Sequence, residues 1–184
     1  MPVGERAPRI DGVIDAAEWQ GALTLPLDPT DARARVQLLS DGMRLYLAGE
    51  APGDTTATGY DQFRFWYHLH LSPAMPYERA FLDGTGSVNV MRSAVFPRGK
   101  DKSHERTDWY THRKAEGASR ADDYRRYELA LDLDEAGLHP GVPFPAFIDI
   151  EGDPVLDAAG NFRSRTIVGR LGSLEAPIWL RIAR

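Results

Sequence analysis

Residues 63–71 read Phe-Arg-Phe-Trp-Tyr-His-Leu-His-Leu, and this stretch decides the class of fold. Side chains of a β-strand point alternately to the two faces of a sheet, and apolar residues occupy every second position here. We therefore expect a strand over residues 60–71 with one face in a hydrophobic core. That face carries Phe63, Phe65, Tyr67, Leu69 and Leu71.

Further strand patterns recur along the chain between turn-forming residues. They cover residues 33–39, 43–50, 87–96, 125–133, 145–151, 162–170 and 178–182. Prolines in residues 72–86 and charges in residues 98–106 predict irregular segments. Many short strands without a long helical period favour an all-β fold, a single antiparallel β-sandwich of jelly-roll type with one or two short helical turns. The predicted core includes Trp19, Phe63, Phe65, Leu129 and Leu131.

The composition limits the functions open to the chain. Its 184 residues suit one domain, and 42% hydrophobic with 27% charged residues is typical of a folded globular protein. A net charge of −5 argues against a nucleic-acid partner, and no apolar run approaches the roughly 20 residues of a membrane-spanning helix. The absence of cysteine excludes disulfides, thiolate metal sites and thiol catalysis.

The N-terminal sequence bears on domain limits and compartment. Residues 1–9 are rich in proline and arginine and are expected to be a flexible segment before a single domain over residues 10–184. They contain no apolar signal segment. A secreted or periplasmic location is therefore expected only if a signal peptide has been removed.

Three motifs, in order along the chain, resemble those of a known family. Residues 10–19 read Ile-Asp-Gly-Val-Ile-Asp-Ala-Ala-Glu-Trp, and residues 44–48 read Arg-Leu-Tyr-Leu-Ala. Residues 127–131 read Tyr-Glu-Leu-Ala-Leu and are followed by Leu138 and Gly141. The pattern is similar to that of the family 9 carbohydrate-binding modules and their relatives. The resemblance implies a β-sandwich, usually secreted and often appended to a glycan-active enzyme, that binds a sugar or calcium.

Position 64 departs from the family pattern, in which an acidic residue stands on this strand. A guanidinium cannot coordinate calcium or accept hydrogen bonds from sugar hydroxyls. It does form a planar fork that matches a carboxylate, so we expect an acidic glycan, such as one containing uronic acid. The alternative is that Arg64 pairs with Asp132 or Glu128 on a neighbouring strand and contacts no ligand.

The second face of this strand carries Arg64, Trp66, His68 and His70. This stripe is either a binding surface or a surface covered by residues 72–86. As a binding surface it offers an indole for stacking on a sugar ring and donors for its hydroxyls. As a metal site, the two histidines would need a third ligand, for which the candidates are His104, His112, Glu128 and Asp132.

Further aromatic residues are candidates for ligand contact. Trp109 and Tyr110 lie in a polar region, where they either extend a sugar site or plug one end of the sandwich. Trp179 points away from the core face of residues 178–182. It either supplies a second stacking ring or covers a sheet edge.

An acidic turn is the candidate for calcium. Asp153, Asp157 and Asn161 offer carboxylate and carbonyl oxygens, the ligands that calcium takes. The alternative is a plain hairpin loop, in which Asp, Asn and Gly are the usual residues. Calcium is possible, and no cofactor is required by the sequence.

These features favour a non-catalytic module that binds carbohydrate and has no nucleic-acid or membrane partner. Two alternatives stay open. A small β-sandwich enzyme would need convergence of His68, His70, His112, Arg64 and Glu128 for acid–base chemistry. A haem domain of the same superfamily would use Met91 with His68 or His70 as axial ligands.

Overall fold

The computed structural model describes residues 1–4, 6–52, 61–67, 76–83, 86–95, 105–110, 115–121, 125–173 and 176–184. Its strands are β1 (Leu23–Pro26), β2 (Arg35–Ser40), β3 (Arg44–Ala51), β4 (Gln62–Tyr67), β5 (Pro76–Asp83), β6 (Val88–Val95), β7 (Glu105–Tyr110), β8 (Ala115–Ala121), β9 (Arg125–Asp132), β10 (Phe144–Leu156), β11 (Phe162–Leu171) and β12 (Ile178–Leu180). Within these residues, no helix has the length and apolar character needed to cross a membrane.

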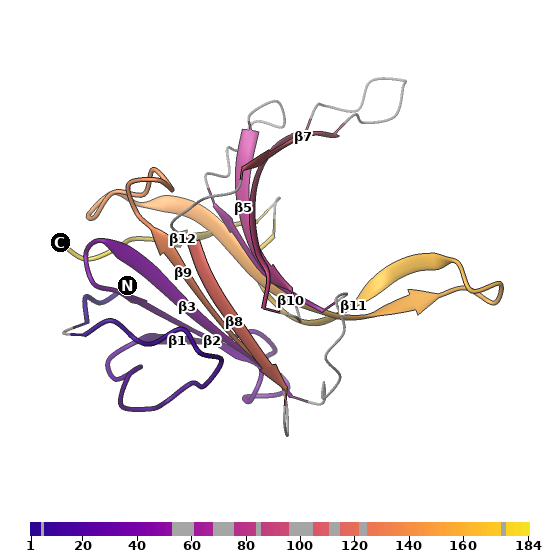
Figure 1. Cartoon of the computed structure of the whole chain (residues 1–184), viewed down its shortest axis with the longest axis horizontal. Helices are drawn as coiled ribbons and strands as arrows, with labels where there is room; N and C mark the ends of the chain where they lie inside the picture. The colour runs from indigo at the N-terminus through magenta and orange to yellow at the C-terminus, as the bar shows by residue number, and fades with distance from the viewer. Residues whose placement is uncertain are drawn as a thin grey trace.

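Two antiparallel sheets pack face to face (Figure 1). Sheet A has the order β1-β2-β3-β9-β8, and sheet B has the order β11-β10-β4-β5-β6-β7, with β12 also paired to β10. The all-β sandwich expected from the alternation pattern is therefore confirmed. Single helical turns also occur. They are marked by hydrogen bonds between residues four apart, from the Trp19 amide to the Asp15 carbonyl and from the Ala136 amide to the Asp132 carbonyl.

The core lies between the two sheets and contains the residues that alternation placed there. Phe63, Phe65, Leu129 and Leu131 are buried between the sheets. The rings of Phe63 and Tyr127 stack across this space with their centroids 5.7 Å apart. Trp19 is also buried, but in a second cluster on the other side of sheet A. All five predicted core residues are thus confirmed.

A charged pair also lies inside the sandwich. The Nη2 atom of Arg125, at the start of β9, is 2.9 Å from Oδ2 of Asp61, just before β4, and both side chains are fully buried. The guanidinium also lies over the ring of Tyr127, 5.9 Å from its centroid. Because β9 belongs to sheet A and β4 to sheet B, this ion pair ties the sheets together at one end.

Several strands were missed or cut short by sequence analysis. Residues 76–83 form β5 within the segment 72–86 that was predicted to be irregular. Pro76 is the first residue of this strand, a position where proline does not interrupt the hydrogen bonds of a sheet. Glu105–Tyr110 form β7, and Ala115–Ala121 form β8. Gly117 of β8 interrupts the apolar pattern because an added Cβ there would lie 2.8 Å from Cδ1 of Leu82 in the facing sheet.

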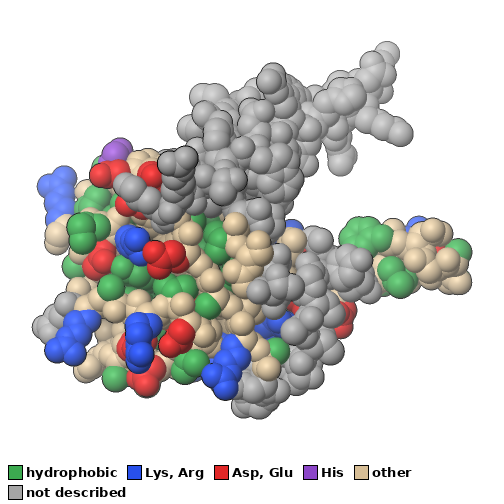
Figure 2. Space-filling view, viewed as in Figure 1, with side chains coloured by type: hydrophobic (Ala, Val, Ile, Leu, Met, Phe, Trp, Pro, Cys, Tyr) green, Lys and Arg blue, Asp and Glu red, His purple; other side chains and the backbone are tan. Residues whose placement is uncertain are grey.

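Strand β10 also runs further than predicted and forms a projecting arm with β11. The pairing with β4 ends at Glu151, and residues 152–156 pair only with β11 among the described strands. This hairpin extends away from the sandwich (Figure 1) and exposes apolar side chains (Figure 2). They are Val155, Leu156, Phe162 and Ile167.

The N-terminal residues lie against sheet A and the C-terminal segment (Figure 1). The Gly4 amide donates to the Ser40 carbonyl, and the Ala183 amide donates to the Met1 carbonyl. Arg9 pairs with Glu18 through its side chain. The flexibility expected for residues 1–9 stays a prediction. The contacts of Met1, Gly4 and Arg9 would restrict such motion.

Candidate functional site

The face of sheet B that points away from the core carries a buried network of charged residues. Asp149 of β10 lies opposite Arg64 of β4 in the ladder. Its carboxylate accepts Arg64 Nε at 2.8 Å and Nη2 at 2.5 Å, and the same Nη2 lies 2.5 Å from Oε1 of Glu151. We call this surface the outer face of sheet B.

Two carboxylates therefore hold the Arg64 guanidinium in place. Burial lowers the pKa of Arg64, but the hydrogen bonds and negative charges of Asp149 and Glu151 outweigh it, so its pKa is raised above the ordinary arginine value. Arg64 was expected either to bind an acidic ligand or to pair with Asp132 or Glu128. The expected pairing with Asp132 or Glu128 is wrong, because the partners of Arg64 are Asp149 and Glu151 of β10.

Trp66 is buried beside this network. Only 7% of its surface is exposed, and its ring stacks on Phe147 with centroids 4.7 Å apart. The Arg64 guanidinium lies 5.4 Å from the same ring, and the indole Nε1 is 3.4 Å from Oδ1 of Asp149. The ring is buried, so the expectation that Trp66 forms an open stacking surface is wrong. Residues 76–83 of the expected cover pair beside β4 as β5, and cover by residues 72–86 stays a prediction.

Trp179 lies on the same face and is open to solvent. It is opposite Pro145 of β10, which precedes Phe147 by two residues and therefore shares its face. The neighbours Ile178 and Leu180 pack toward the core, while 61% of Trp179 is exposed. The predicted direction of Trp179 is confirmed. Its ring is accessible to solvent and lies beside the buried pair of Trp66 and Phe147.

Arg170 of β11 belongs to this face and was missed by sequence analysis. It lies opposite Asp149 in the ladder, and its Nη2 is 3.3 Å from Asp149 Oδ2. Its side chain is 44% exposed. Alternation along residues 162–170 could have placed it on a face but gave no sign of which strand would be its neighbour.

Other predicted site residues cannot be placed with these. His68, His70, His104 and His112 lie outside the described residues. Trp109 and Tyr110 belong to β7, where Trp109 is opposite Met91 of β6 in the ladder. The side chains of these three residues are likewise outside the described part of the structure.

The acidic turn between β10 and β11 is held by local hydrogen bonds. Oδ1 of Asp157 accepts the amides of Ala159 and Asn161, and Oδ2 accepts the Asn161 side chain at 3.3 Å. Oδ2 also lies 3.4 Å from Nε of Arg163. Among the described residues, no group of three or more His, Asp or Glu side chains is placed to hold a metal ion. Calcium binding by Asp153, Asp157 and Asn161 stays a prediction.

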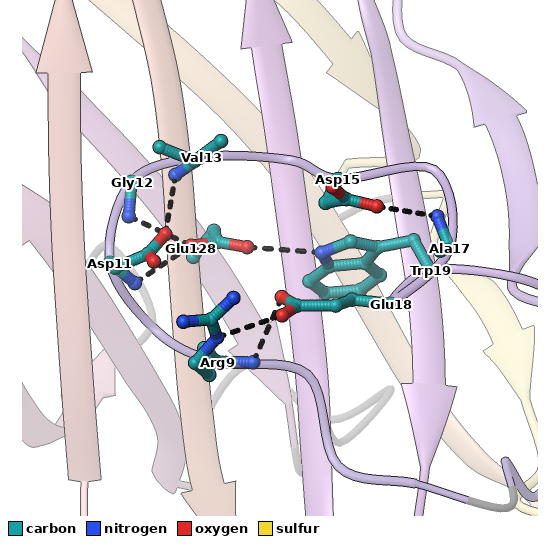
Figure 3. Close-up of polar contacts among 9 residues, drawn as sticks. All are labelled: Arg9, Asp11, Gly12, Val13, Asp15, Ala17, Glu18, Trp19 and Glu128. Carbon is teal, nitrogen blue, oxygen red and sulfur yellow. Dashed lines mark hydrogen bonds and ion pairs between the residues drawn. The ribbon is translucent and has the colours of Figure 1, made fainter.

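Glu128 has a different role from the ones proposed for it. It is fully buried on the side of sheet A that faces away from sheet B (Figure 3). Its Oε2 accepts the amides of Asp11 at 3.0 Å and Gly12 at 2.8 Å, and its Oε1 accepts the indole N–H of Trp19 at 3.0 Å. Burial raises the pKa of Glu128, although these three hydrogen bonds oppose that effect.

The three sequence motifs thus converge on one structural cluster. Residues 10–19 cross the outer side of sheet A, where Trp19 packs with Tyr46 of β3 and Ala130 of β9. Glu128 and Arg64 lie on opposite sides of the sandwich, so the catalytic convergence required by the enzyme alternative does not occur for this pair. These motif residues therefore form the packing that holds the N-terminal segment on sheet A.

Comparison with known proteins agrees with this interpretation. No family model matches the sequence, and no curated protein matches it either. A family 9 carbohydrate-binding module from Caldicellulosiruptor kristjanssonii in complex with glucose superimposes with a TM-score of 0.55 at 14% identity, over 100% of this chain and 96% of that one. The chain has the fold of a family 9 carbohydrate-binding module.

Two further structures support the same fold. The cellotriose complex of a C. kristjanssonii family 9 module gives a TM-score of 0.53 at 14% identity, over 100% of this chain and 93% of that one. A Bacteroides uniformis protein, provisionally described as carbohydrate-binding, gives 0.55 at 12% identity, over 91% and 87%. The family 9 resemblance in the three motifs is therefore confirmed for the fold.

Proposed function

We propose that this module binds carbohydrate at the outer face of sheet B, with Trp179 as the ring on which a sugar stacks. The observation that carries the proposal is the exposure of Trp179 beside a rigid, buried floor of aromatic and charged residues. A flat indole complements the apolar face of a pyranose. The similar modules crystallised with glucose and cellotriose support this function.

The buried residues contribute to the proposed site by fixing its shape. The stacked pair of Trp66 and Phe147 and the ion pairs of Arg64 hold β4 and β10 in register beneath the accessible residues. A preformed surface loses less conformational entropy on binding than one that must order itself. We also propose that the module is secreted and that it associates with a glycan-active enzyme.

A glycan array followed by calorimetry with glucose and cellotriose tests the proposal. Trp179→Ala should abolish binding without lowering the melting temperature, because the side chain is mostly exposed. Phe162→Ala is the matched control, since Phe162 is 58% exposed but lies on the projecting arm. The proposal would be overturned if Trp179→Ala bound glycans with the affinity of the wild type, or if the wild type bound no glycan.

A further inference from the structure

Among the side chains that the structure describes, the charged network on the outer face of sheet B has as many cations as carboxylates, but these groups differ in exposure. It contains two cations, Arg64 and Arg170, and two carboxylates, Asp149 and Glu151. The side chain of Asp149 is fully buried, and those of Arg64 and Glu151 are about nine-tenths buried. Arg170 is 44% exposed, so the most accessible charge among these four residues is positive.

Arg170 also retains hydrogen-bonding capacity. Arg64 already takes both oxygens of Asp149 at 2.8 and 2.5 Å, whereas Arg170 reaches only one of them, at 3.3 Å. Within the described part of the chain, the Arg170 side chain makes no other hydrogen bond or ion pair. A guanidinium carries five N–H donors, and a fork of two of them matches a carboxylate.

The positions of Arg170 and Trp179 set the length of a ligand that uses both. Strands β11 and β12 both pair with β10, where Arg170 is opposite Asp149 and Trp179 is opposite Pro145. These two β10 positions are four residues apart, which corresponds to about 13 Å along a strand. The two backbone positions are thus further apart than one sugar ring is wide, so we expect a ligand that uses both side chains to be an oligosaccharide.

We propose that the ligand is an acidic oligosaccharide in which one unit stacks on Trp179 and the carboxylate of another unit pairs with Arg170. The inference rests on the proposed function and adds a ligand class and a specificity-determining residue to it. It also transfers the acidic-ligand role from Arg64, which is held by two carboxylates, to Arg170. Asp149 acts as a positioning residue, because it holds both guanidinium groups on this face.

The experiment compares cellotriose with cellotriuronic acid, the same β-1,4-linked trisaccharide with a carboxylate at C6 of each unit. For the wild type we expect the acidic trisaccharide to bind on the order of ten-fold more tightly, the effect of one charge-assisted hydrogen bond. Glucuronic acid alone should show no such advantage over glucose. The advantage should shrink toward about 1 M salt, where the Debye length is about 3 Å.

Two variants separate this inference from the proposed function. Arg170→Gln should lose the preference for the acidic trisaccharide and keep the affinity for cellotriose, whereas Arg163→Gln, an exposed arginine on the arm, should keep both. Equal wild-type affinities, or a preference that survives Arg170→Gln, would overturn the inference and leave carbohydrate binding intact. Failure of the wild type to bind any of these sugars would overturn both. Melting curves check that each variant is folded.

Discussion

The indole N–H of Trp19 donates to the carboxylate of Glu128 across 109 residues of sequence, at a distance of 3.0 Å. The same carboxylate accepts two backbone amides of the N-terminal segment, at Asp11 and Gly12. One buried side chain of β9 thus fixes the segment that covers sheet A. Glu128→Ala should lower the free energy of unfolding by about 3 kcal/mol or more, because three donors, two of them buried, lose their acceptor. Chemical denaturation measures this loss.

The control for this variant is Glu116→Ala on the neighbouring strand β8. Glu116 is exposed and pairs with Arg44, and such surface ion pairs contribute about 0–1 kcal/mol. Similar losses for Glu128→Ala and Glu116→Ala would show that the buried acceptor has no special role.

The stability should also depend on pH through Glu128. Burial raises its pKa in the folded protein above the ordinary glutamate value of about 4.3, so folding favours the protonated acid. Its contribution is complete below the ordinary pKa and is lost as the pH rises through the raised one. The free energy of unfolding of the wild type should therefore fall relative to that of Glu128→Gln as the pH rises above about 4.3. Parallel curves from denaturation across this range would contradict the prediction.

Trp66→Ala should be strongly destabilising, in contrast to the small effect that its predicted exposure implied. The ring is buried and stacks on Phe147, and removal of a buried tryptophan costs about 3–5 kcal/mol. Trp179→Ala, on the same face but exposed, should change stability by no more than about 0.5 kcal/mol. Thermal melts of the two variants provide the comparison, and equal melting temperatures would refute it.

Gly117 should not tolerate a side chain. An added Cβ would approach Cδ1 of Leu82 to 2.8 Å and would overlap Val88 of β6. Overpacking of this kind costs about 1–3 kcal/mol. Gly117→Ala should be less damaging in a Val88→Ala background, because the space vacated by valine accommodates the new methyl group. A double-mutant cycle measures the coupling, and strict additivity would count against the predicted clash.

Breaking the buried ion pair should cost more than removing both of its members. Arg125→Met or Asp61→Asn each leaves the other group in a fully buried position, and such losses are about 3–5 kcal/mol. The double variant should be more stable than either single variant, and its loss should therefore be far smaller than the sum of the two single losses. Denaturation of all three proteins tests this, and additive losses would show that the two residues act independently.

The predictability of the fold differs between its parts for identifiable reasons. Strict alternation from Phe63 to Tyr67 was enough to place a strand and its core face, because both layers of the sandwich bury one side of each strand. Strand β8 was missed because its sequence, Ala-Glu-Gly-Ala-Ser-Arg-Ala, lacks large apolar residues. Gly117 is needed there for close approach between the sheets, a requirement that no local pattern reveals.

The site was less predictable because it depends on which strands become neighbours. Alternation placed Arg64 and Trp66 away from the core but could not show that β10 would bring Asp149, Glu151 and Phe147 beside them. Burial of Arg64 and Trp66 follows from that pairing. Trp179 was placed correctly because its own strand sets its direction, whereas Arg170 was missed because its significance arises only from its position beside Asp149.

Strand β10 should show two regimes of amide hydrogen exchange along one continuous segment. Residues 146–150 lie in the middle of sheet B and are buried, so their amides should exchange only when the whole sandwich unfolds. Residues 152–156 lie beyond the pairing with β4 and include the exposed Val155 and Leu156, and the opening of such a hairpin requires much less free energy. Protection should therefore fall steeply past Glu151, so that one strand reports both global unfolding and local fraying of the arm.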